Sequence, residues 1–398
     1  MKKILFVINT LGRGGAEAAL IQLIKRFDPD EYRIDLYVIL SQGELIERIP
    51  GNVVLLNKNY DNSSVLSGEG KKALKKKIIK LLFSNASIIK NFFYIAGNGI
   101  KMVFSGKVLP DKLLWKALSD GSETFDDEYD LAVAYIEGAS AYYVADYVKA
   151  RKKAAFIHVN YSEAGYNRKL DKNKYLNFDK IFTVSEDVKE SFMKVYPECA
   201  DRTDVFENII DRDEIINKAN DGIGFEDDYN GKRIVTVGRL TAQKAIDVSV
   251  EACRKLIEKG ENIRWYVLGE GELRGTLEAL IDKYGLKDSF ILTGVKDNPY
   301  PYIKQCDIYV HASRYEGKSI AIREAMILGR PIIVSDCKSN LEQVSNDDAL
   351  VTTLDPDDLS GKIMTLLHDE KLCEKLGSNA EKRYLDINDD TYKLLKLI

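Results

Sequence analysis

The sequence predicts an α/β protein with two consecutive domains, each built on a parallel β-sheet. Three observations lead to this prediction. Short apolar runs alternate with helix-sized segments along both halves of the chain, as in β-α-β units. A polar stretch with three glycines, residues 211–231, interrupts this alternation. The 398 residues are enough for two or three domains of ordinary size.

The first half begins with residues 4–8, a β-branched run that suits a strand buried on both faces. Apolar residues at helical spacing predict a helix over residues 16–27. The other strand-like runs of this half are 34–40, 53–56, 131–136, 154–159 and 180–184. Those of the second half are 233–237, 264–268, 290–292, 308–310, 331–334 and 350–352.

These runs set the predicted domain limits. The first domain is expected to span residues 1–210 and the second residues 211–375, with a link at 211–231. Residues 376–398 are expected to form a helix that packs back toward the first domain. Ligands of such sheets usually bind beyond the carboxyl ends of the strands, and here also in a cleft between the domains.

Composition excludes several classes of protein. With 45% hydrophobic and 30% charged residues, the chain is globular rather than disordered. A net charge of −4 argues against a nucleic-acid-binding surface over the whole chain. The five cysteines are scattered and never in C-x-x-C spacing, which indicates a reducing compartment. No long uncharged apolar run and no signal-peptide cleavage pattern occurs, so a cytoplasmic location is predicted.

One segment departs from this charge balance. Residues 71–116 contain eleven lysines and a single acidic residue, Asp111, and aromatic and aliphatic residues are interleaved with the lysines. A basic amphipathic stretch of this kind is typical of a helix that lies on an anionic membrane surface. The alternative is a pair of ordinary surface helices that pack on the first domain. We predict a peripheral position at the inner membrane face.

The most specific motif spans residues 316–331 and has the form Glu-Gly-x-Ser-x4-Glu-Ala-x3-Gly-x-Pro. Gly317 permits a tight loop, and Ser319 can cap a helix that follows it. Glu324 then lies in the second turn of this helix, whereas Glu316 lies in the loop ahead of it. Glutamates eight positions apart are common by themselves, but this context after a strand is specific.

An anion site is expected at the start of that helix. The backbone N–H groups of Lys318, Ser319 and Ile320 face outward there, and the helix dipole favours negative charge. A diphosphate can rest on these groups, with one carboxylate on each side accepting hydrogen bonds from sugar hydroxyls.

This motif resembles the E-x7-E signature of the retaining glycosyltransferases of family four. That family has the GT-B fold, in which two Rossmann-like domains face a cleft. Four further segments resemble family motifs in order and spacing: the glycine-rich first loop at 9–15, the entry to the second domain at 208–210, the diphosphate-binding stretch at 237–244, and the G-x-G turn at 267–271. The resemblance covers nearly the whole chain and is weakest from residue 56 to 129.

The resemblance implies a hexosyltransferase that uses a nucleotide-sugar, most simply a UDP-sugar, and retains the anomeric configuration. Glu324 is expected to hold the ribose hydroxyls and Glu316 the hydroxyls of the donor sugar. Arg239 and Lys244 would place two positive charges where the leaving diphosphate develops negative charge. Retention without a clear enzymic nucleophile implies front-face attack, with a phosphate oxygen of the leaving group taking the acceptor proton.

The first domain supplies two further predicted contacts. Backbone amides of the loop that contains Gly14 and Gly15 can approach a ligand closely. His158 ends an apolar run, and the segment around it resembles the family's Trp-x-His-x-Asp segment, with Asn160 in place of the acid. The resemblance implies that His158 contacts the donor sugar. His311, which ends another strand ahead of the motif, is a candidate supporting group.

The predicted site thus has two overlapping sets of residues. The catalytic set is Glu316, Arg239, Lys244 and His158. The donor-binding set is Gly14, Gly15, Arg239, Lys244, Glu316, Gly317, Lys318, Ser319, Ile320 and Glu324.

Two positions depart from the family pattern. Lys318 stands where an aromatic or aliphatic residue is common, and it can touch phosphate or sugar, so it bears on donor identity. Ala245 stands where glycine is usual, and its one extra methyl group should be tolerated. No metal or other cofactor is expected, because the family does not need one. The acidic pairs that begin at Asp211 and at Asp355 are better explained as helix caps.

The predicted acceptor is a glycan attached to a lipid, in capsule or other cell-surface polysaccharide synthesis. One alternative is a GT-B nucleotide-sugar epimerase, which typically lacks the Glu316 and Glu324 arrangement. Another is a non-catalytic GT-B partner subunit, which should have lost one of Glu316, Arg239, Lys244 or Glu324. All four are present.

Overall fold

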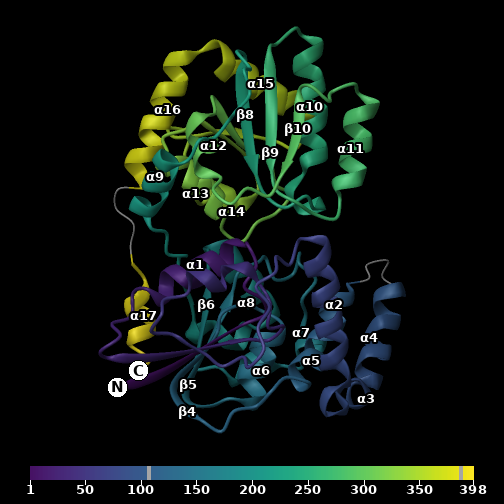
Figure 1. Ribbon diagram of the computed structural model, residues 1–398, viewed down its shortest axis with the longest axis vertical. Helices are drawn as coiled ribbons and strands as arrows, with labels where there is room; N and C mark the ends of the chain where they lie inside the picture. The colour runs from purple at the N-terminus through teal and green to yellow at the C-terminus, as the bar shows by residue number, and fades with distance from the viewer. Residues whose placement is uncertain (105–108, 385–388) are drawn as a thin grey trace. The chain divides into compact units, whose positions relative to one another are not determined.

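The computed structural model describes residues 1–104, 109–384 and 389–398. The chain divides into two compact units: Met1–Ile209 with Asp389–Ile398, and Ile210–Asn388 (Figure 1). Each unit contains one parallel sheet with helices packed against it. The predicted α/β class with two parallel-sheet domains is therefore confirmed.

The first unit is built on a seven-stranded parallel sheet with strand order β3-β2-β1-β4-β5-β6-β7. Its strands are β1 (Lys2–Ile8), β2 (Tyr32–Val38), β3 (Val54–Leu55), β4 (Glu128–Ala134), β5 (Lys149–Ile157), β6 (Lys180–Thr183) and β7 (Thr203–Val205). Alternate residues of β1 belong to the hydrophobic clusters on the two opposite faces of the sheet. Phe6 packs on one face, and Leu5 and Val7 pack on the other. A strand buried on both faces reads as a continuous apolar run, which is why β1 was evident in the sequence.

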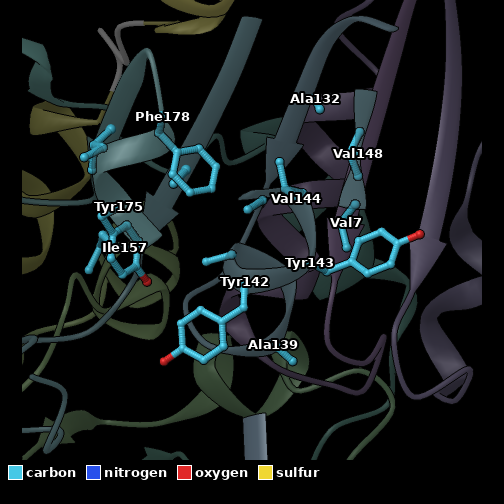
Figure 2. Packing of buried hydrophobic residues seen from close by; sticks show 14 of the residues in the cluster. Val7, Ala132, Ala139, Tyr142, Tyr143, Val144, Val148, Ile157, Tyr175 and Phe178 are labelled. Atoms are coloured by element: carbon cyan, nitrogen blue, oxygen red, sulfur yellow. The ribbon is translucent and has the colours of Figure 1, made fainter. Parts of the chain in front are cut away.

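Helices of the first unit are α1 (Gly15–Ile24), α2 (Gly68–Phe83), α3 (Ser87–Lys90), α4 (Phe92–Phe104), α5 (Pro110–Asp120), α6 (Ala139–Tyr147), α7 (Arg168–Asp171), α8 (Glu186–Val195) and α17 (Thr391–Leu395). Figure 2 shows part of the core on one face of the sheet, where Val7 and Ile157 of the strands lie near Tyr142 and Val144 of α6. One buried charge is accommodated there. Asp171 accepts hydrogen bonds from the hydroxyls of Tyr142, Tyr161 and Tyr196.

The second unit has a six-stranded parallel sheet with order β10-β9-β8-β11-β12-β13. Its strands are β8 (Lys232–Val237), β9 (Ile263–Leu268), β10 (Phe290–Gly294), β11 (Ile308–His311), β12 (Ile332–Ser335) and β13 (Leu350–Thr352). Its helices are α9 (Arg212–Asp221), α10 (Ile246–Glu258), α11 (Arg274–Lys283), α12 (Tyr300–Gln305), α13 (Ile320–Ile327), α14 (Lys338–Leu341), α15 (Pro356–His368) and α16 (Glu370–Arg383).

The C-terminal boundary differs from the prediction. Helix α16 belongs to the second unit, because Leu376 and Ala380 are buried in its two apolar clusters. The part that joins the first unit is residues 389–398, not 376–398. There Leu394 is buried in the core, and the Asp390 carboxylate accepts a hydrogen bond from the Glu207 N–H at 2.9 Å.

The predicted link at 211–231 is also partly wrong. It contains helix α9, which is capped by the Asp211 side chain and packs against α12 and α13 of the second unit. Two buried apolar residues anchor this helix. They are Ile215 and Ala219, which lie four positions apart and therefore on the same face of the helix. The polar composition of the segment conceals this narrow apolar stripe.

The basic segment forms helices α2 to α5. Helix α5 contacts α2, α3 and α4 and also packs on α6 (Figure 1). Among the described residues no single helix is long and apolar enough to cross a bilayer. Length and composition suffice only when Gly68–Lys90 and Phe92–Phe104 are taken together, and these two parts meet at an angle of 91°.

Each sheet has a point where the strand order reverses. In the first unit it lies between β1 and β4, and in the second between β8 and β11. Ligands of open α/β sheets bind beyond the carboxyl ends of the strands at such points. The loops that follow these four strands therefore define where a site is sought in each unit.

Candidate active site

Close backbone contact shapes the loops that follow β8 and β9 in the second unit. The Gly238 N–H donates a hydrogen bond to the Leu268 carbonyl at 3.0 Å. A Cβ atom on Gly269 would lie 1.9 Å from the Gly238 carbonyl oxygen, and one on Gly271 would lie 2.3 Å from the Leu240 carbonyl oxygen. Both glycines of the G-x-G turn are therefore required by the approach of the two loops.

A buried ion pair joins two predicted site residues across this end of the sheet. The Lys244 Nζ lies 2.5 Å from Glu316 Oε1, although the residues are far apart in the sequence. Lys244 ends a short 3₁₀ turn after β8, and Glu316 lies in the loop that follows β11. Glu316 is only 6% exposed, so its charge depends on this lysine.

Two further side chains contact the Glu316 carboxylate. His311 Nε2 lies 3.0 Å from Oε1, and Gln243 Nε2 donates to Oε2 at 3.2 Å. Burial by itself raises the pKa of Glu316, but the Lys244 charge and the His311 hydrogen bond outweigh it and hold this pKa well below the ordinary value. Burial and the Lys244 charge lower the pKa of His311 below its ordinary value.

Ala245, which replaces the glycine of the family pattern, has a strained backbone conformation. Its backbone is left-handed, with φ of 47° and ψ of 36°, and its side chain is fully buried. An L-residue in this conformation is strained by about 1–2 kcal/mol relative to the right-handed one. The methyl group is tolerated, as predicted, but with strain.

The loop and helix of the motif differ from the prediction in one detail. Helix α13 begins at Ile320 after Ser319, but the Ser319 side chain does not cap it and is buried instead. Gly317 is also buried and Lys318 is half-buried. The loop is held from outside the motif, because the Ser339 hydroxyl donates to the Glu316 carbonyl at 2.8 Å.

Glu324 lies in the second turn of α13, as predicted. Its Oε1 accepts a hydrogen bond from the Tyr300 hydroxyl of α12 at 2.9 Å. Burial raises the pKa of Glu324 to about 7, and the Tyr300 hydrogen bond offsets only part of this effect. A carboxyl group poised near neutrality can exchange its proton when a ligand offers hydroxyl donors.

Arg239 lies at the same end of the sheet, directly after Gly238 at the end of β8. Its side chain is exposed and has no hydrogen bond or ion pair to any residue that the structure describes. The two predicted cations therefore differ: Lys244 is committed to Glu316, whereas Arg239 is available to an incoming anion.

The first unit brings together Asn9 at the end of β1, Glu137 at the end of β4 and His158 at the end of β5. The Asn9 amide donates to the Glu137 carbonyl at 3.1 Å, and the His158 backbone N–H donates to the Glu137 carboxylate at 3.0 Å. Glu137 is buried, and burial raises its pKa. Gly138 permits this turn, because its φ is 90° and a Cβ atom would lie 2.9 Å from the Trp115 ring.

The His158 imidazole is half-buried and stacks on Phe156, with ring centroids 6.0 Å apart. Burial lowers the pKa of His158 to about 4, so the ring is neutral at physiological pH. Its Nε2 atom is buried and has no hydrogen-bond partner within residues 1–104, 109–384 and 389–398. Such an atom suits a neutral contact to a ligand hydroxyl.

Gly14 lies in the loop between β1 and α1, as predicted, and Gly15 is the first residue of α1. Gly14 is the residue before the helix, and its backbone is extended, with φ of −122°. A Cβ atom on Gly14 would lie 2.2 Å from a Glu17 carboxylate oxygen, so the glycine makes room for that side chain rather than permitting an unusual turn.

Sequence reasoning missed several members of the two groups. No motif pointed to Glu137, Tyr300 or Ser339, because each belongs to the site only through tertiary contact. Gln243 lies within the predicted 237–244 stretch, but no role was assigned to it. The acidic pairs behave as predicted: the side chains of Asp211 and Asp355 cap α9 and α15. Among the described residues, no group of three or more His, Cys, Asp or Glu side chains could hold a metal ion.

Two consecutive parallel-sheet units of this kind are the architecture of the GT-B fold. Residues 225–383 match the family model described as "Glycosyl transferases group 1". This match supports the resemblance to GT-B glycosyltransferases noted in the sequence, without testing the retaining mode.

Two relatives from Campylobacter jejuni carry specific names. The chain is 27% identical over 212 residues to N-acetylgalactosamine-N,N'-diacetylbacillosaminyl-diphospho-undecaprenol 4-alpha-N-acetylgalactosaminyltransferase, covering 52% of this chain and 56% of that protein. It is 26% identical over 348 residues to N,N'-diacetylbacillosaminyl-diphospho-undecaprenol alpha-1,3-N-acetylgalactosaminyltransferase, covering 79% and 82%. The chain spans about half the length of the first curated relatives that it matches.

Among solved structures, the fold resembles that of Anabaena Alr3699/HepE in complex with UDP-glucose. The TM-score is 0.68 with 16% identity, and the match covers 100% of both chains. At this identity the likeness concerns the fold, and it confirms the GT-B architecture.

Proposed function

We propose that this protein transfers a hexose-type sugar from a UDP-sugar to a glycan acceptor attached to a lipid, in the synthesis of cell-surface polysaccharide. The observation that carries the proposal is the Lys244–Glu316 ion pair at the switch point of a group 1 glycosyl transferase domain. It joins the loop after β8 to the loop ahead of α13, which are the two loops assigned to the donor diphosphate.

A UDP-sugar is the preferred donor. Support comes from the Anabaena HepE protein, which has this fold and whose structure contains UDP-glucose. Arg239 would bind the diphosphate with a guanidinium that has no hydrogen bond or ion pair to break among the described residues. Lys244 has three N–H donors, so it can bind a phosphate oxygen while keeping its hydrogen bond to Glu316. Glu324 would accept hydrogen bonds from the ribose hydroxyls.

A lipid-linked acceptor is supported by the names of both Campylobacter relatives, which specify diphospho-undecaprenol substrates. Both names also specify alpha products. Formation of an α-linkage from a donor whose sugar is α-linked to diphosphate means retention. We therefore include retention in the proposal.

The reaction would proceed at the front face of the sugar. The bond from the anomeric carbon to the phosphate oxygen breaks as the acceptor oxygen forms its bond to the same carbon. The acceptor proton passes to the departing phosphate oxygen. Arg239, Lys244 and the start of α13 stabilise the negative charge that grows on the diphosphate. Glu316 of the second unit would bind sugar hydroxyls and orient the ring. In the first unit, the neutral His158 offers its Nε2 atom to a ligand hydroxyl.

Ligand-induced thermal stabilisation tests the donor. The Tm is expected to rise with UDP and UDP-sugars and to change much less with GDP, ADP and their sugars, because only a bound ligand stabilises the folded state. Equal shifts for all three bases would contradict uridine selectivity. NMR of the first-formed anomer then distinguishes retention from inversion, and sugar release or isomerisation without acceptor would favour the epimerase alternative.

Turnover is expected to be unchanged by EDTA. We propose that the positive charge at the diphosphate comes from Arg239, Lys244 and the helix start, so a bound metal ion is not needed there. Initial rates with and without chelator test this. Loss of activity in EDTA followed by recovery with Mn²⁺ would contradict metal independence without affecting the assignment of the fold.

A further inference from the structure

The helices of the basic segment expose apolar side chains to an unusual extent. Eight of the fourteen large hydrophobic side chains that are exposed within the described residues fall between positions 79 and 104. These eight are Ile79, Phe83, Ile89, Phe92, Phe93, Ile100, Val103 and Phe104. Isolated exposed apolar residues need no explanation, but a cluster of this kind marks an interaction surface.

Helix α4 is apolar on both its inner and outer faces. Tyr94 and Met102 face inward, where Met102 is buried in a small cluster with Leu113 and Leu170. On the outside, Phe93 and Phe104 are each 88% exposed. Ile100 lies between them at a helical spacing of seven and four residues, so the three form one outward stripe. A helix in water normally places polar residues there.

Lysines border this apolar surface and no acid lies within it. Lys80, Lys90 and Lys101 are exposed, and each lies next to or near exposed apolar residues of the same helix or turn. Between Glu69 and Asp111 the sequence contains no acidic residue. Such lysines can keep their stems on apolar surface while the ammonium groups reach anionic headgroups.

Two lysines of the segment are paired within the first unit and are therefore not available to bind lipid headgroups. Lys77 donates to the Ser41 carbonyl at 2.5 Å and lies 3.6 Å from an Asp61 carboxylate oxygen. Lys116 is buried and paired with Asp120 and Asp146. These two hold the fold of the first unit, so a charge-reversal test must leave them unchanged.

We propose that α3 and α4 lie on an anionic lipid bilayer, with Phe93 and Phe104 inserted at the acyl boundary and Lys80, Lys90 and Lys101 at the headgroups. Amphipathic helices with aromatic and basic residues bind at this level of a bilayer. The inference deepens the proposed function, because a lipid-linked acceptor is presented at that surface, but its test does not depend on activity.

Charge complementarity favours a bilayer over a second copy of the chain. A two-fold contact through this surface would oppose the lysines of both copies, with no acidic residue between Glu69 and Asp111 to pair them. Anionic lipids supply the missing negative charge. Because α2–α3 and α4 meet at 91°, the segment suits a position along the surface rather than a straight span.

Vesicle flotation of the full chain tests the charges. The protein is expected to float at low salt with vesicles of phosphatidylcholine and phosphatidylglycerol, and much less with phosphatidylcholine alone. At about 1 M salt, where the Debye length is about 3 Å, binding should weaken strongly. Lys80→Glu/Lys90→Glu/Lys101→Glu should lower the partition coefficient at least about tenfold. The matched control Lys371→Glu/Lys375→Glu/Lys382→Glu reverses three exposed lysines of α16 and should change nothing.

Insertion is tested separately. Tryptophan fluorescence of Phe93→Trp should be quenched by brominated phosphatidylcholine in anionic vesicles. Quenching should be absent for Ile223→Trp, which replaces an equally apolar residue that is 74% exposed in the second unit. Phe93→Ser/Phe104→Ser should reduce flotation while leaving Tm unchanged, because both side chains are exposed.

Three results would overturn the inference. These are no flotation of the wild-type protein with anionic vesicles at low salt, equal quenching of the two tryptophan variants, or a dimer in sedimentation velocity that Phe93→Ser/Phe104→Ser dissociates. Failure of glycosyl transfer in a protein that floats as expected would contradict the proposed function instead and leave the surface assignment intact.

Discussion

Arg239→Ala is expected to lower kcat by about a hundredfold or more while leaving the free energy of unfolding unchanged. The charge on the leaving diphosphate is greatest in the transition state, so removal of a cation there affects the rate more than ground-state binding. The Arg239 side chain is exposed, and truncation would break no hydrogen bond or ion pair to the described residues. Initial rates with a UDP-sugar and urea unfolding of the same variant measure the two effects.

Lys244→Ala should reduce kcat to a similar extent and, in contrast, also destabilise the fold by about 3 kcal/mol. The destabilisation follows because Glu316 is buried and loses its counter-charge. The double variant Lys244→Ala/Glu316→Gln removes the stranded charge, so it should regain most of the stability and none of the activity.

Turnover of the folded single variants decides whether these cations act on the leaving group or only stabilise the fold. If Lys244→Ala lowers stability but turnover of the folded fraction is unchanged, the ion pair only holds the two loops together. If Arg239→Ala is fully active, the diphosphate is not bound at the end of β8. Either result would contradict the assignment of these cations to the leaving group.

The class of fold could be predicted because its strands are buried on both faces. Strands such as β1 and β8 read as short apolar runs, and the helices between them indicate parallel pairing. The three-residue strand β7 was missed, since a central Asp204 breaks its apolar character. Helix α9 was missed because two buried residues, Ile215 and Ala219, are too few to show a helical period in a polar segment.

The motif residues could be predicted, but their partners could not. Glu316 and Lys244 were both candidates, yet nothing in a linear sequence indicates that one neutralises the other. Glu137 and Tyr300 belong to no motif and enter their sites only because the chain brings strand and helix ends together. The same limit applies to the basic segment: its charge is visible in the sequence, whereas the commitment of Lys77 to Asp61 is a tertiary contact.

Glu324→Gln is expected to weaken binding of UDP-glucose by about 1.5–3 kcal/mol, or roughly 10- to 100-fold in Kd. The substitution keeps the shape of the side chain but replaces a charged acceptor of the ribose hydroxyls with a neutral one. Calorimetric titration of wild type and variant measures the loss. With 2′-deoxy-UDP-glucose the two proteins should bind more alike, because one hydroxyl donor is then missing from both complexes.

The pH dependence of UDP-glucose affinity provides a second test of the role of Glu324. The pKa of Glu324 is about 7 in the unliganded protein, and the ionised form is the one that accepts hydroxyl hydrogen bonds. Affinity of the wild-type protein should therefore fall as pH is lowered from 8 to 6, with proton release on binding near neutrality. UDP-glucose is the suitable probe, since its diphosphate carries no proton that titrates near neutral pH. The affinity of Glu324→Gln should vary much less over this range.

Stability of the unliganded protein should change in the opposite sense. The pKa of Glu324 is higher in the folded protein than the ordinary value of 4.5, so the folded state binds the proton more tightly. Its contribution is complete below about pH 4.5 and is lost as pH rises through about 7. Glu324→Gln is neutral at every pH, so at pH 8 it should be more stable than wild type by about 1–2 kcal/mol, with allowance for partial exposure. An equal Tm difference at pH 5 and pH 8 would mean that Glu324 is already ionised in the free protein. A variant that is more stable and yet binds the donor less tightly would identify this carboxyl group as held in the second turn of α13 for the ligand.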